Sequence, residues 1–203
     1  MILLGLTGSI GMGKSTTATM FADEGAVIWN ADDAVHRLYS RGGAGVEPVG
    51  EAFPGTVVDG AVDRALLAEA LGRDDAAFKR LEGIVHPLVV AGRTGELAEA
   101  RERGVKLAVL DIPLLFEGGG QTAFDAVVVV TADSDTQERR VLARPGMTRE
   151  RFEAILERQM PDADKRRLAD FIVETDQGLE VARAQVRTIV ATVLDPDWIS
   201  PHR

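Results

Sequence analysis

The residues best suited to chemistry lie close to the N-terminus, in the run from Gly8 to Ser15. This run fits G-x-x-x-x-G-K-[ST], a loop whose backbone N–H groups cradle phosphates. Its glycines adopt conformations closed to other residues, so the N–H groups can turn inward as an anion nest. We expect Lys14 to reach the β- and γ-phosphates of a nucleotide and the Ser15 hydroxyl to ligate Mg²⁺. The alternative is a glycine-rich turn with an exposed lysine.

The segments on either side of this loop support the phosphate-binding interpretation. The apolar run Ile2 to Thr7 is predicted as a short buried strand, and Ser15 to Asp23 as a helix. Such a helix aims the positive end of its dipole at the loop, where an anion would bind. Strand, glycine loop and helix therefore occur in the order that the motif requires.

An acidic pair follows the second predicted strand. Asp32 and Asp33 come just after the run Ala26 to Trp29. In an open parallel sheet, ligands bind beyond the carboxyl ends of the strands, so a carboxylate there could face the phosphates. Asp32 could accept a proton from a substrate hydroxyl during phosphoryl transfer. Alternatively, one of the two aspartates caps a helix that starts at Ala34.

The third predicted strand ends in a second group of candidate residues. Asp111 is at the strand end, where a carboxylate of the Walker-B type would orient Mg²⁺ or its water. Pro113 ends the strand. The apolar residues that follow either pack under an insertion or line a substrate cleft, and Glu117 is interpreted as a solvated charge. These apolar residues are Leu114, Leu115 and Phe116.

Three further residues carry weaker signals. His86 precedes Pro87 between two predicted helices, and we interpret it as structural because no second metal-type ligand stands at helical spacing. Arg140 and Arg144 are four residues apart and would share one helix face. Such a pair could clamp phosphates when a lid closes, or it could belong to a solvated charged helix.

Five apolar, β-branched runs define the expected architecture. Most are continuous rather than alternating, as expected of strands that are covered on both faces. Helical patterns separate them, which predicts an α/β fold with a five-stranded parallel sheet and helices on both faces. The runs are Ile2 to Thr7, Ala26 to Trp29, Lys106 to Asp111, Ala126 to Thr131 and Phe171 to Glu174.

Two long gaps between the strands are expected to form additional parts. The first contains helical patterns over 62–71 and 76–84, a break at His86-Pro87, and a helix that resumes over 88–103. The second is rich in charge and split by glycine and proline, which suits a mobile lid of two helices. We therefore expect a nucleotide-binding core (1–30, 105–132 and 169–203), a helical acceptor-binding insertion (31–104) and a lid (133–168).

Composition narrows the function class. The 203 residues carry a formal net charge of −9, which argues against a duplex-binding surface, since such a surface needs a basic face. There is no cysteine, so disulfides and thiolate chemistry are excluded. No run approaches the ~20 apolar residues of a membrane span, and the N-terminal run is too short for a signal peptide. We expect a cytosolic enzyme without nucleic-acid or membrane partners, as a monomer or small homo-oligomer.

Taken together, these motifs resemble the dephospho-CoA kinase family. The resemblance covers nearly the whole chain, in order, and the His-Pro and Pro-Leu-Leu-Phe-Glu elements make it more specific than the phosphate loop alone. It rests on the runs 5–16, 31–32, 81–89 and 111–117, on Gln137 with Arg140 and Arg144, on Gln159, and on Ala169-Asp170.

The resemblance implies that MgATP phosphorylates the ribose 3′-hydroxyl of dephospho-CoA, the last step of coenzyme A synthesis. It makes Asp32 the general base, Lys14 and Arg140 its catalytic partners, and Ser15 and Asp111 the metal-binding residues. The implied ATP-binding residues are Gly8, Gly11, Met12, Gly13, Lys14, Ser15, Thr16, Arg144 and Thr175. The implied acceptor-side residues are Thr7, Asp32, His86, Asp111, Leu114, Leu115, Phe116 and Glu117.

The chain departs from the family pattern at four positions, none of them in the phosphate loop. Asn30 replaces the first acid of Asp-Ala-Asp, and Thr175 stands where asparagine is common near the adenine. Pro145 and Ile155 replace a usual aspartate and a usual arginine of the lid. Lid contacts are therefore the part that the resemblance transfers least directly.

Two other functions compete with this prediction. Another P-loop kinase could act on a nucleoside monophosphate or a small metabolite, because spacing alone does not define the acceptor pocket. A regulatory ATPase would bind or hydrolyse nucleotide without needing an acceptor. A GTPase is disfavoured because the chain has no Asn-Lys-x-Asp guanine motif.

Overall fold

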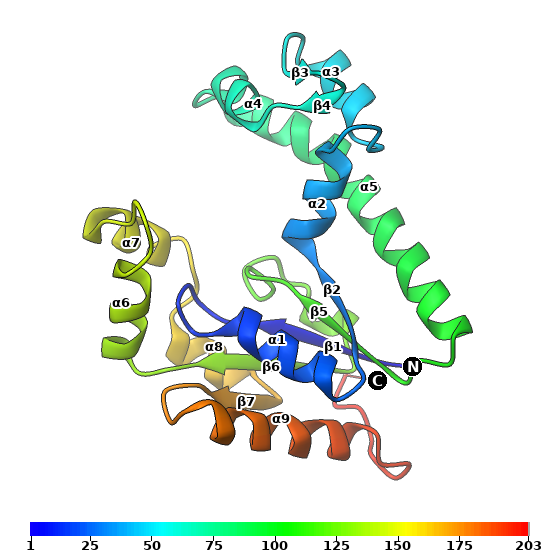
Figure 1. The fold of residues 1–203 in the computed structure, drawn as a ribbon, viewed down its shortest axis with the longest axis vertical. Helices are drawn as coiled ribbons and strands as arrows, with labels where there is room; N and C mark the ends of the chain where they lie inside the picture. Colours follow the sequence, from blue (N-terminus) through cyan, green and yellow to red (C-terminus); the bar gives the residue numbers. More distant parts are fainter. Residues whose placement is uncertain (203) are drawn as a thin grey trace. The chain divides into compact units, whose positions relative to one another are not determined.

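The computed structural model describes residues 1–202, and the chain divides into two compact units. The first unit contains residues 1–29 and the chain from residue 101 onward, and the second contains residues 30–100. Figure 1 shows the helices and strands of each unit along the chain.

The first unit is built on a five-stranded parallel sheet in the order β2-β5-β1-β6-β7, which confirms the predicted fold class. All residues of β5 and β6 are buried, as their continuous apolar sequences predict for strands covered on both faces. The strands are β1 (Ile2–Thr7), β2 (Val27–Asn30), β5 (Leu107–Asp111), β6 (Ala126–Thr131) and β7 (Phe171–Glu174).

Helices cover both faces of this sheet. Figure 1 shows α1 and α9 side by side across one face, where Phe21 and Val186 join the inward side chains of the strands in one apolar core. The helix α8 contacts β6. The helices of this unit are α1 (Lys14–Asp23), α6 (Ser134–Leu142), α7 (Arg149–Leu156), α8 (Asp162–Leu168) and α9 (Leu179–Val193), with a short 3-10 turn, η1 (Gln121–Ala123).

The strand order explains why the phosphate loop lies where it does. From β1 the chain runs to β2 and returns through β5 on one side of β1, and β6 and β7 then extend the sheet on the other side. The order therefore reverses at β1, and in open α/β sheets ligands bind at such a switch point. The loop that follows Thr7 begins at the carboxyl end of this strand.

The second unit is a helical subdomain with its own small core. Tyr39, Val49 and Phe53 pack together with apolar residues of α4 and α5. The Arg80 guanidinium lies 5.5 Å from the centre of the Phe53 ring, which links α5 to the end of α3. Its elements are α2 (Ala31–Tyr39), α3 (Val46–Ala52), β3 (Val57–Val58), β4 (Ala61–Val62), α4 (Arg64–Leu71) and α5 (Asp75–Glu102).

The predicted helix break at His86-Pro87 is wrong. The single helix α5 runs from Asp75 to Glu102 with Pro87 inside it. A proline there removes the hydrogen bond to the carbonyl four residues earlier, which belongs to Gly83. Gly83 and Pro87 are exposed, so water can hydrate that carbonyl, and the apolar side chains of Ile84 and Val85, just before the proline, pack against the core of the second unit.

Two other local predictions need correction. The segment predicted as a helix from Val62 begins at Arg64, because residues 57–58 and 61–62 pair as a two-stranded antiparallel hairpin. The segment 133–168 contains three helices rather than two, since its last turn, α8, is separated from α7 by a loop that ends at Pro161. Among residues 1–202, no helix combines the length and the apolarity that crossing a bilayer requires.

Candidate active site

The phosphate loop between β1 and α1 is shaped by glycines in backbone conformations that other residues rarely adopt. Gly11 and Gly13 have φ angles of 81° and 94°, in the region that L side chains avoid. A Cβ atom on Gly11 would lie 2.5 Å from Val141 Cγ2, and one on Gly13 would lie 3.1 Å from Thr175 Oγ1. The loop therefore packs directly against α6 and the end of β7, with room for backbone only.

The lysine of the loop is held by the acid at the end of the third predicted strand. Lys14 Nζ forms an ion pair with Asp111 Oδ1. The strands β1 and β5 are neighbours, with Leu6 paired to Asp111, so the acid lies at the carboxyl edge of the sheet beside the loop. The side chain of Asp111 is only 2% exposed and that of Lys14 is 15% exposed. The cation is therefore fixed at the loop by a largely buried carboxylate.

Two glutamines hold the backbone of the loop at one residue. Gln137 Nε2 donates to the carbonyl of Ile10 at 2.8 Å, and the N–H of Ile10 donates to Gln159 Oε1 at 3.1 Å. Gln137 lies on α6, and Gln159 follows the end of α7. The first half of the loop is thus tied to the segment predicted as a lid at two places, one on α6 and one after α7.

Arg140 is fixed by a hydrogen-bond network around Thr175. Its Nη1 donates to Thr175 Oγ1 at 2.8 Å and its Nη2 donates to the Thr175 carbonyl at 2.7 Å. The Thr175 hydroxyl in turn donates to the carbonyl of Met12 at 2.7 Å. One threonine therefore joins the loop, α6 and the end of β7, and orients the guanidinium beside the loop.

A cleft of about 310 Å³ opens beside these groups. Both predicted arginines line it, although they do not share a helix face as expected. The helix α6 ends at Leu142, so Arg144 lies in the following turn. The lining also includes Gly11, Gly13, Thr16, Thr17, Met20, Thr175, Leu179 and Ala182. Phosphate-loop residues and two guanidinium groups thus surround one cavity, a combination suited to a polyphosphate.

The second unit carries Asp32, and here the predicted capping alternative is wrong. The helix α2 begins at Ala31, and the side chain of Asn30 caps it by accepting from the N–H of Asp33 at 3.0 Å. Asp32 and Asp33 are exposed in the first turn of the helix, where carboxylates interact favourably with the dipole. The residue that departs from the family pattern therefore supplies the cap, and neither aspartate is needed for it.

The segment after β5 contains both core and surface residues. Leu115 and Phe116 are buried, whereas Leu114 is exposed. The Thr7 hydroxyl donates to the carbonyl of Pro113 at 3.1 Å, which links the end of β1 to this segment. Of the three apolar residues predicted to pack or to line a cleft, two therefore pack into the first unit.

Glu117 is not the solvated charge that its sequence context suggested. Its Oε1 accepts from the N–H of Met160 at 2.7 Å and lies 3.0 Å from Lys165 Nζ. Burial raises the pKa of this carboxyl, but the hydrogen bonds from Met160 and Lys165 outweigh burial and hold the pKa below its ordinary value. Glu117 is therefore a fixed carboxylate at neutral pH.

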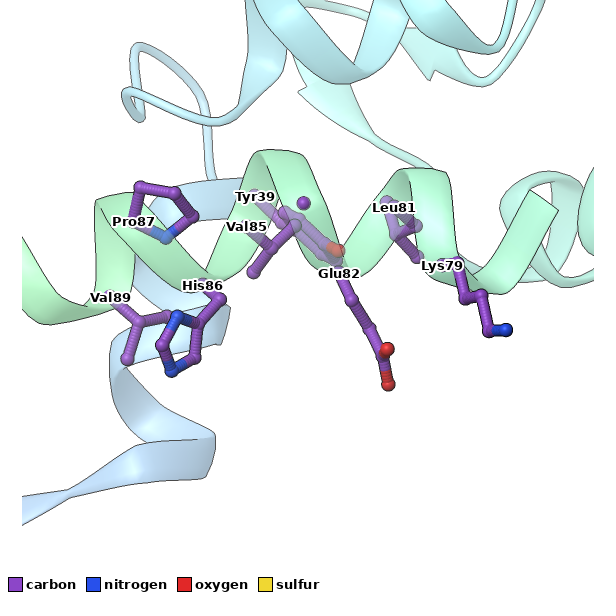
Figure 2. A pocket seen from close by; sticks show the side chains of 9 residues that line it. Tyr39, Lys79, Leu81, Glu82, Val85, His86, Pro87 and Val89 are labelled. Carbon is purple, nitrogen blue, oxygen red and sulfur yellow. The ribbon is translucent and has the colours of Figure 1, made fainter. Parts of the chain in front are cut away.

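His86 lines a groove on the surface of the second unit. Figure 2 shows His86 and Glu82, four residues apart, projecting from the same side of α5. The groove has a volume of about 750 Å³, and Tyr39 of α2 contributes to its wall. Burial raises the pKa of the Tyr39 hydroxyl, and the nearby Arg64 partly offsets this effect. The groove thus offers apolar walls with a few polar groups.

Sequence reasoning missed the side chain that pairs with Glu117. Lys165 is fully buried although it begins the charged run Lys165-Arg166-Arg167, which is typical of a solvated helix. Asp162, three residues earlier, accepts from the hydroxyl of Thr131 at 2.7 Å. The available signal was the three-residue spacing of Asp162 and Lys165, which places both charged side chains on the side of α8 toward β6.

Comparison with known proteins places the chain among kinases. The family model described as dephospho-CoA kinase matches residues 2–180. A dephospho-CoA kinase of Mesorhizobium japonicum is 60% identical over 190 residues, covering 94% of this chain and 95% of the relative.

Two solved structures have a similar fold. TT1252 from Thermus thermophilus has a TM-score of 0.83 and 33% identity, covering 95% of this chain and 97% of that one. A shikimate kinase from Acinetobacter baumannii has a TM-score of 0.55 and 16% identity, over 97% and 95% of the two chains, which shows a likeness of fold alone.

Proposed function

The chain belongs to the dephospho-CoA kinase family, and we propose that it transfers the γ-phosphoryl group of ATP to the ribose 3′-hydroxyl of dephospho-CoA. The products are coenzyme A and ADP, and the reaction completes coenzyme A synthesis. The observation that carries this proposal is the family match over residues 2–180, which includes the phosphate loop and both motifs assigned to the acceptor.

The nucleotide half of the reaction belongs to the first unit. The loop N–H groups and the N-terminus of α1 would bind the β- and γ-phosphates. Lys14, already fixed beside the loop by Asp111, is positioned to exchange this partner for phosphate oxygens. Arg140 and Arg144 line the same cleft and would neutralise charge that develops as the phosphoryl group moves.

The donor set suits a magnesium ion. Ser15 supplies a hydroxyl and Asp111 a carboxylate, and Mg²⁺ prefers oxygen ligands with phosphates completing its shell. Among the described residues, no group of three or more histidine or acidic side chains could hold a metal without the nucleotide. We therefore propose that Mg²⁺ arrives with ATP, held by Ser15 and Asp111, and supplies charge neutralisation to the phosphates.

The acceptor half of the reaction rests on Asp32. We assign it as the base that takes the proton of the 3′-hydroxyl while that oxygen attacks the γ-phosphorus. The bond between the γ-phosphorus and the bridging oxygen of ADP breaks in the same step. Asp32 is exposed at the start of α2 and is not needed as a helix cap, so its carboxylate is available for this role.

Other residues would bind the rest of the acceptor. Glu117 offers a fixed carboxylate, and Leu114 offers an exposed apolar side chain in the same segment. The groove that contains His86 combines apolar walls with polar groups, as a long, partly apolar acceptor needs. These assignments rest on the motif positions together with the surface that each residue occupies.

The test is ADP formation from MgATP with different acceptors. Dephospho-CoA is compared with AMP, CMP, shikimate, gluconate and no acceptor, and the variant Lys14→Ala controls for a contaminating kinase. We expect turnover with dephospho-CoA alone. Preference for another acceptor, or ADP formation without any acceptor, would retain the phosphate loop and reject the proposed substrate. The fold that this chain shares with a shikimate kinase makes this comparison necessary.

A further inference from the structure

One short segment contacts both the phosphate loop and the segment that follows β5. We call residues 159–165 the 159–165 turn; it runs from the loop after α7 into the first residues of α8, which begins at Asp162. At its start, Gln159 accepts from the N–H of Ile10 in the phosphate loop. One residue later, the N–H of Met160 donates to Glu117. At its end, Lys165 pairs with the same carboxylate oxygen.

The burial of these groups makes the contacts costly to lose. The Lys165 side chain is 0% exposed and the Glu117 side chain is 19% exposed, so this ion pair is largely removed from water. A buried charge whose partner is removed is strongly disfavoured, which gives the pair one preferred arrangement. The polar atoms of Ile10 are likewise bonded to Gln159 and Gln137 rather than left to solvent. The turn is therefore specified at both ends.

We propose that the 159–165 turn is a positioning element that couples the phosphate loop to the Glu117 carboxylate. Lys165 and Gln159 are its positioning residues: Lys165 acts through Glu117, and Gln159 acts through Ile10. A displacement of the turn moves both contacts, because adjacent residues, Gln159 and Met160, make them. The kinetic part of this inference rests on the proposed function, since it assigns Glu117 to the acceptor side, whereas the structural coupling does not.

Hydrogen exchange tests the coupling without any need for turnover. Gln159→Leu removes the acceptor for the Ile10 N–H, and Lys165→Met removes the cation beside Glu117. We expect Gln159→Leu to speed exchange in peptides covering residues 113–120, and Lys165→Met to speed exchange in peptides covering residues 7–13. Arg158→Gln, which changes an exposed neighbour, is the control. Effects confined to the segment that each side chain contacts directly would overturn the proposal.

Steady-state kinetics tests the consequence for the reaction. Gln159 contacts the phosphate loop, yet the coupling predicts that Gln159→Leu raises the KM for dephospho-CoA about fivefold, the effect of one lost hydrogen bond. Lys165→Arg should restore most of what Lys165→Met loses, because it keeps the charge. A rise in the KM for ATP alone would overturn the coupling.

The two tests separate the two proposals. Coupled changes in exchange in an enzyme that does not turn over dephospho-CoA would support the positioning element and reject the substrate. Normal turnover with uncoupled exchange would reject the positioning element and support the substrate. The melting temperature of each variant is measured as well. If Lys165 had a merely structural role, the kinetic change would follow from lost stability and the melting temperature would fall.

Discussion

The phosphate-loop side of the first unit and the surface of the second unit differ in how firmly their candidate residues are held. Lys14, Arg140 and Ile10 each have a specific partner in the fold, respectively Asp111, Thr175 and the two glutamines. Asp32 and His86 are exposed on helix surfaces. The groups proposed to bind the nucleotide are therefore held by contacts within the fold, whereas the groups of the second unit proposed to bind the acceptor lie at exposed positions.

This contrast predicts different kinetic signatures for the two units. Where the fold already fixes a group, removing it should lower both binding and rate, because the same contact serves the ground state and the transition state. Where the substrate fixes a group, removal of that group should change either kcat or KM, and not both together. Substitutions in each unit therefore test whether the two units differ in this way.

Lys14→Ala should have the largest effect. The variant loses the cation that faces the phosphates and leaves the buried Asp111 without its lysine partner. We expect kcat/KM for ATP to fall by about 10³-fold, with nucleotide affinity reduced as well. Steady-state kinetics and a fluorescent ATP-binding assay measure the two quantities, and Lys106→Ala, at an exposed lysine, is the control. Unchanged ATP affinity would contradict the assignment of Lys14.

Asp32→Asn should come next and should separate rate from binding. Loss of a general base lowers kcat by about 10²-fold to 10³-fold and leaves ATP affinity nearly unchanged. Asp33→Asn is a matched control, because both aspartates are exposed in the first turn of α2 and interact with the same dipole. Equal effects of the two substitutions would show that helix electrostatics, and not proton transfer, is responsible.

Thr175→Val, in the first unit, should have a smaller kinetic effect than Lys14→Ala or Asp32→Asn. The valine keeps the shape of the side chain and removes the hydroxyl that bonds to Arg140 and to the Met12 carbonyl. We expect kcat to fall about tenfold with a raised KM for ATP, since two hydrogen bonds are lost. Thr175→Ser keeps the hydroxyl and should restore near-normal kinetics. If the valine variant matches the wild type, Arg140 does not need Thr175 for its orientation.

His86→Ala should change the KM for the acceptor by only about fivefold, the scale of a single hydrogen bond. The KM for ATP and kcat should stay close to the wild-type values, because the histidine lies in the groove of the second unit. His36→Ala removes another exposed histidine of that unit and serves as the control. An effect on kcat instead of KM would conflict with a binding role for the groove.

Lys165→Met should also change the acid stability of the protein. The pKa of Glu117 is lowered from its ordinary value of 4.5, so this carboxylate contributes stability above that pH and loses the contribution as pH falls through the lowered pKa. Without Lys165, one of the groups that oppose the effect of burial is lost, so the pKa of Glu117 rises and its contribution to stability shrinks. Urea unfolding at pH 7 and pH 4 should show a smaller difference in the free energy of unfolding for the variant. Equal differences would mean that Lys165 does not set this pKa.

The sequence predicted the features that depend on neighbouring residues. The phosphate loop was predicted from one eight-residue motif, and three of the five strands have the bounds that their continuous apolar runs indicated. The other two differ by one residue at one or both ends. Local patterns succeed here because strand burial and glycine turns are properties of short segments.

Features that depend on distant residues escaped prediction. Thr175 and Met12 are 163 residues apart, and Glu117 and Met160 are 43 apart, so nothing in either local sequence reports the contact. The continuity of α5 through Pro87 also depends on the contacts of Ile84 and Val85 with the core of the second unit, which outweigh the local tendency to break. The roles of Asp32 and of the other site residues also depend on distant residues, and they remain predictions.

Product analysis with a blocked acceptor tests most directly whether the 3′-hydroxyl of dephospho-CoA receives the phosphoryl group. The enzyme is incubated with MgATP and either dephospho-CoA or its 3′-deoxy analogue, and ADP and the acceptor product are followed by ³¹P NMR and mass spectrometry. We expect coenzyme A and equimolar ADP with dephospho-CoA, and neither product with the deoxy analogue. Phosphorylation of the deoxy analogue, or ADP formation at the same rate with both compounds, would contradict it.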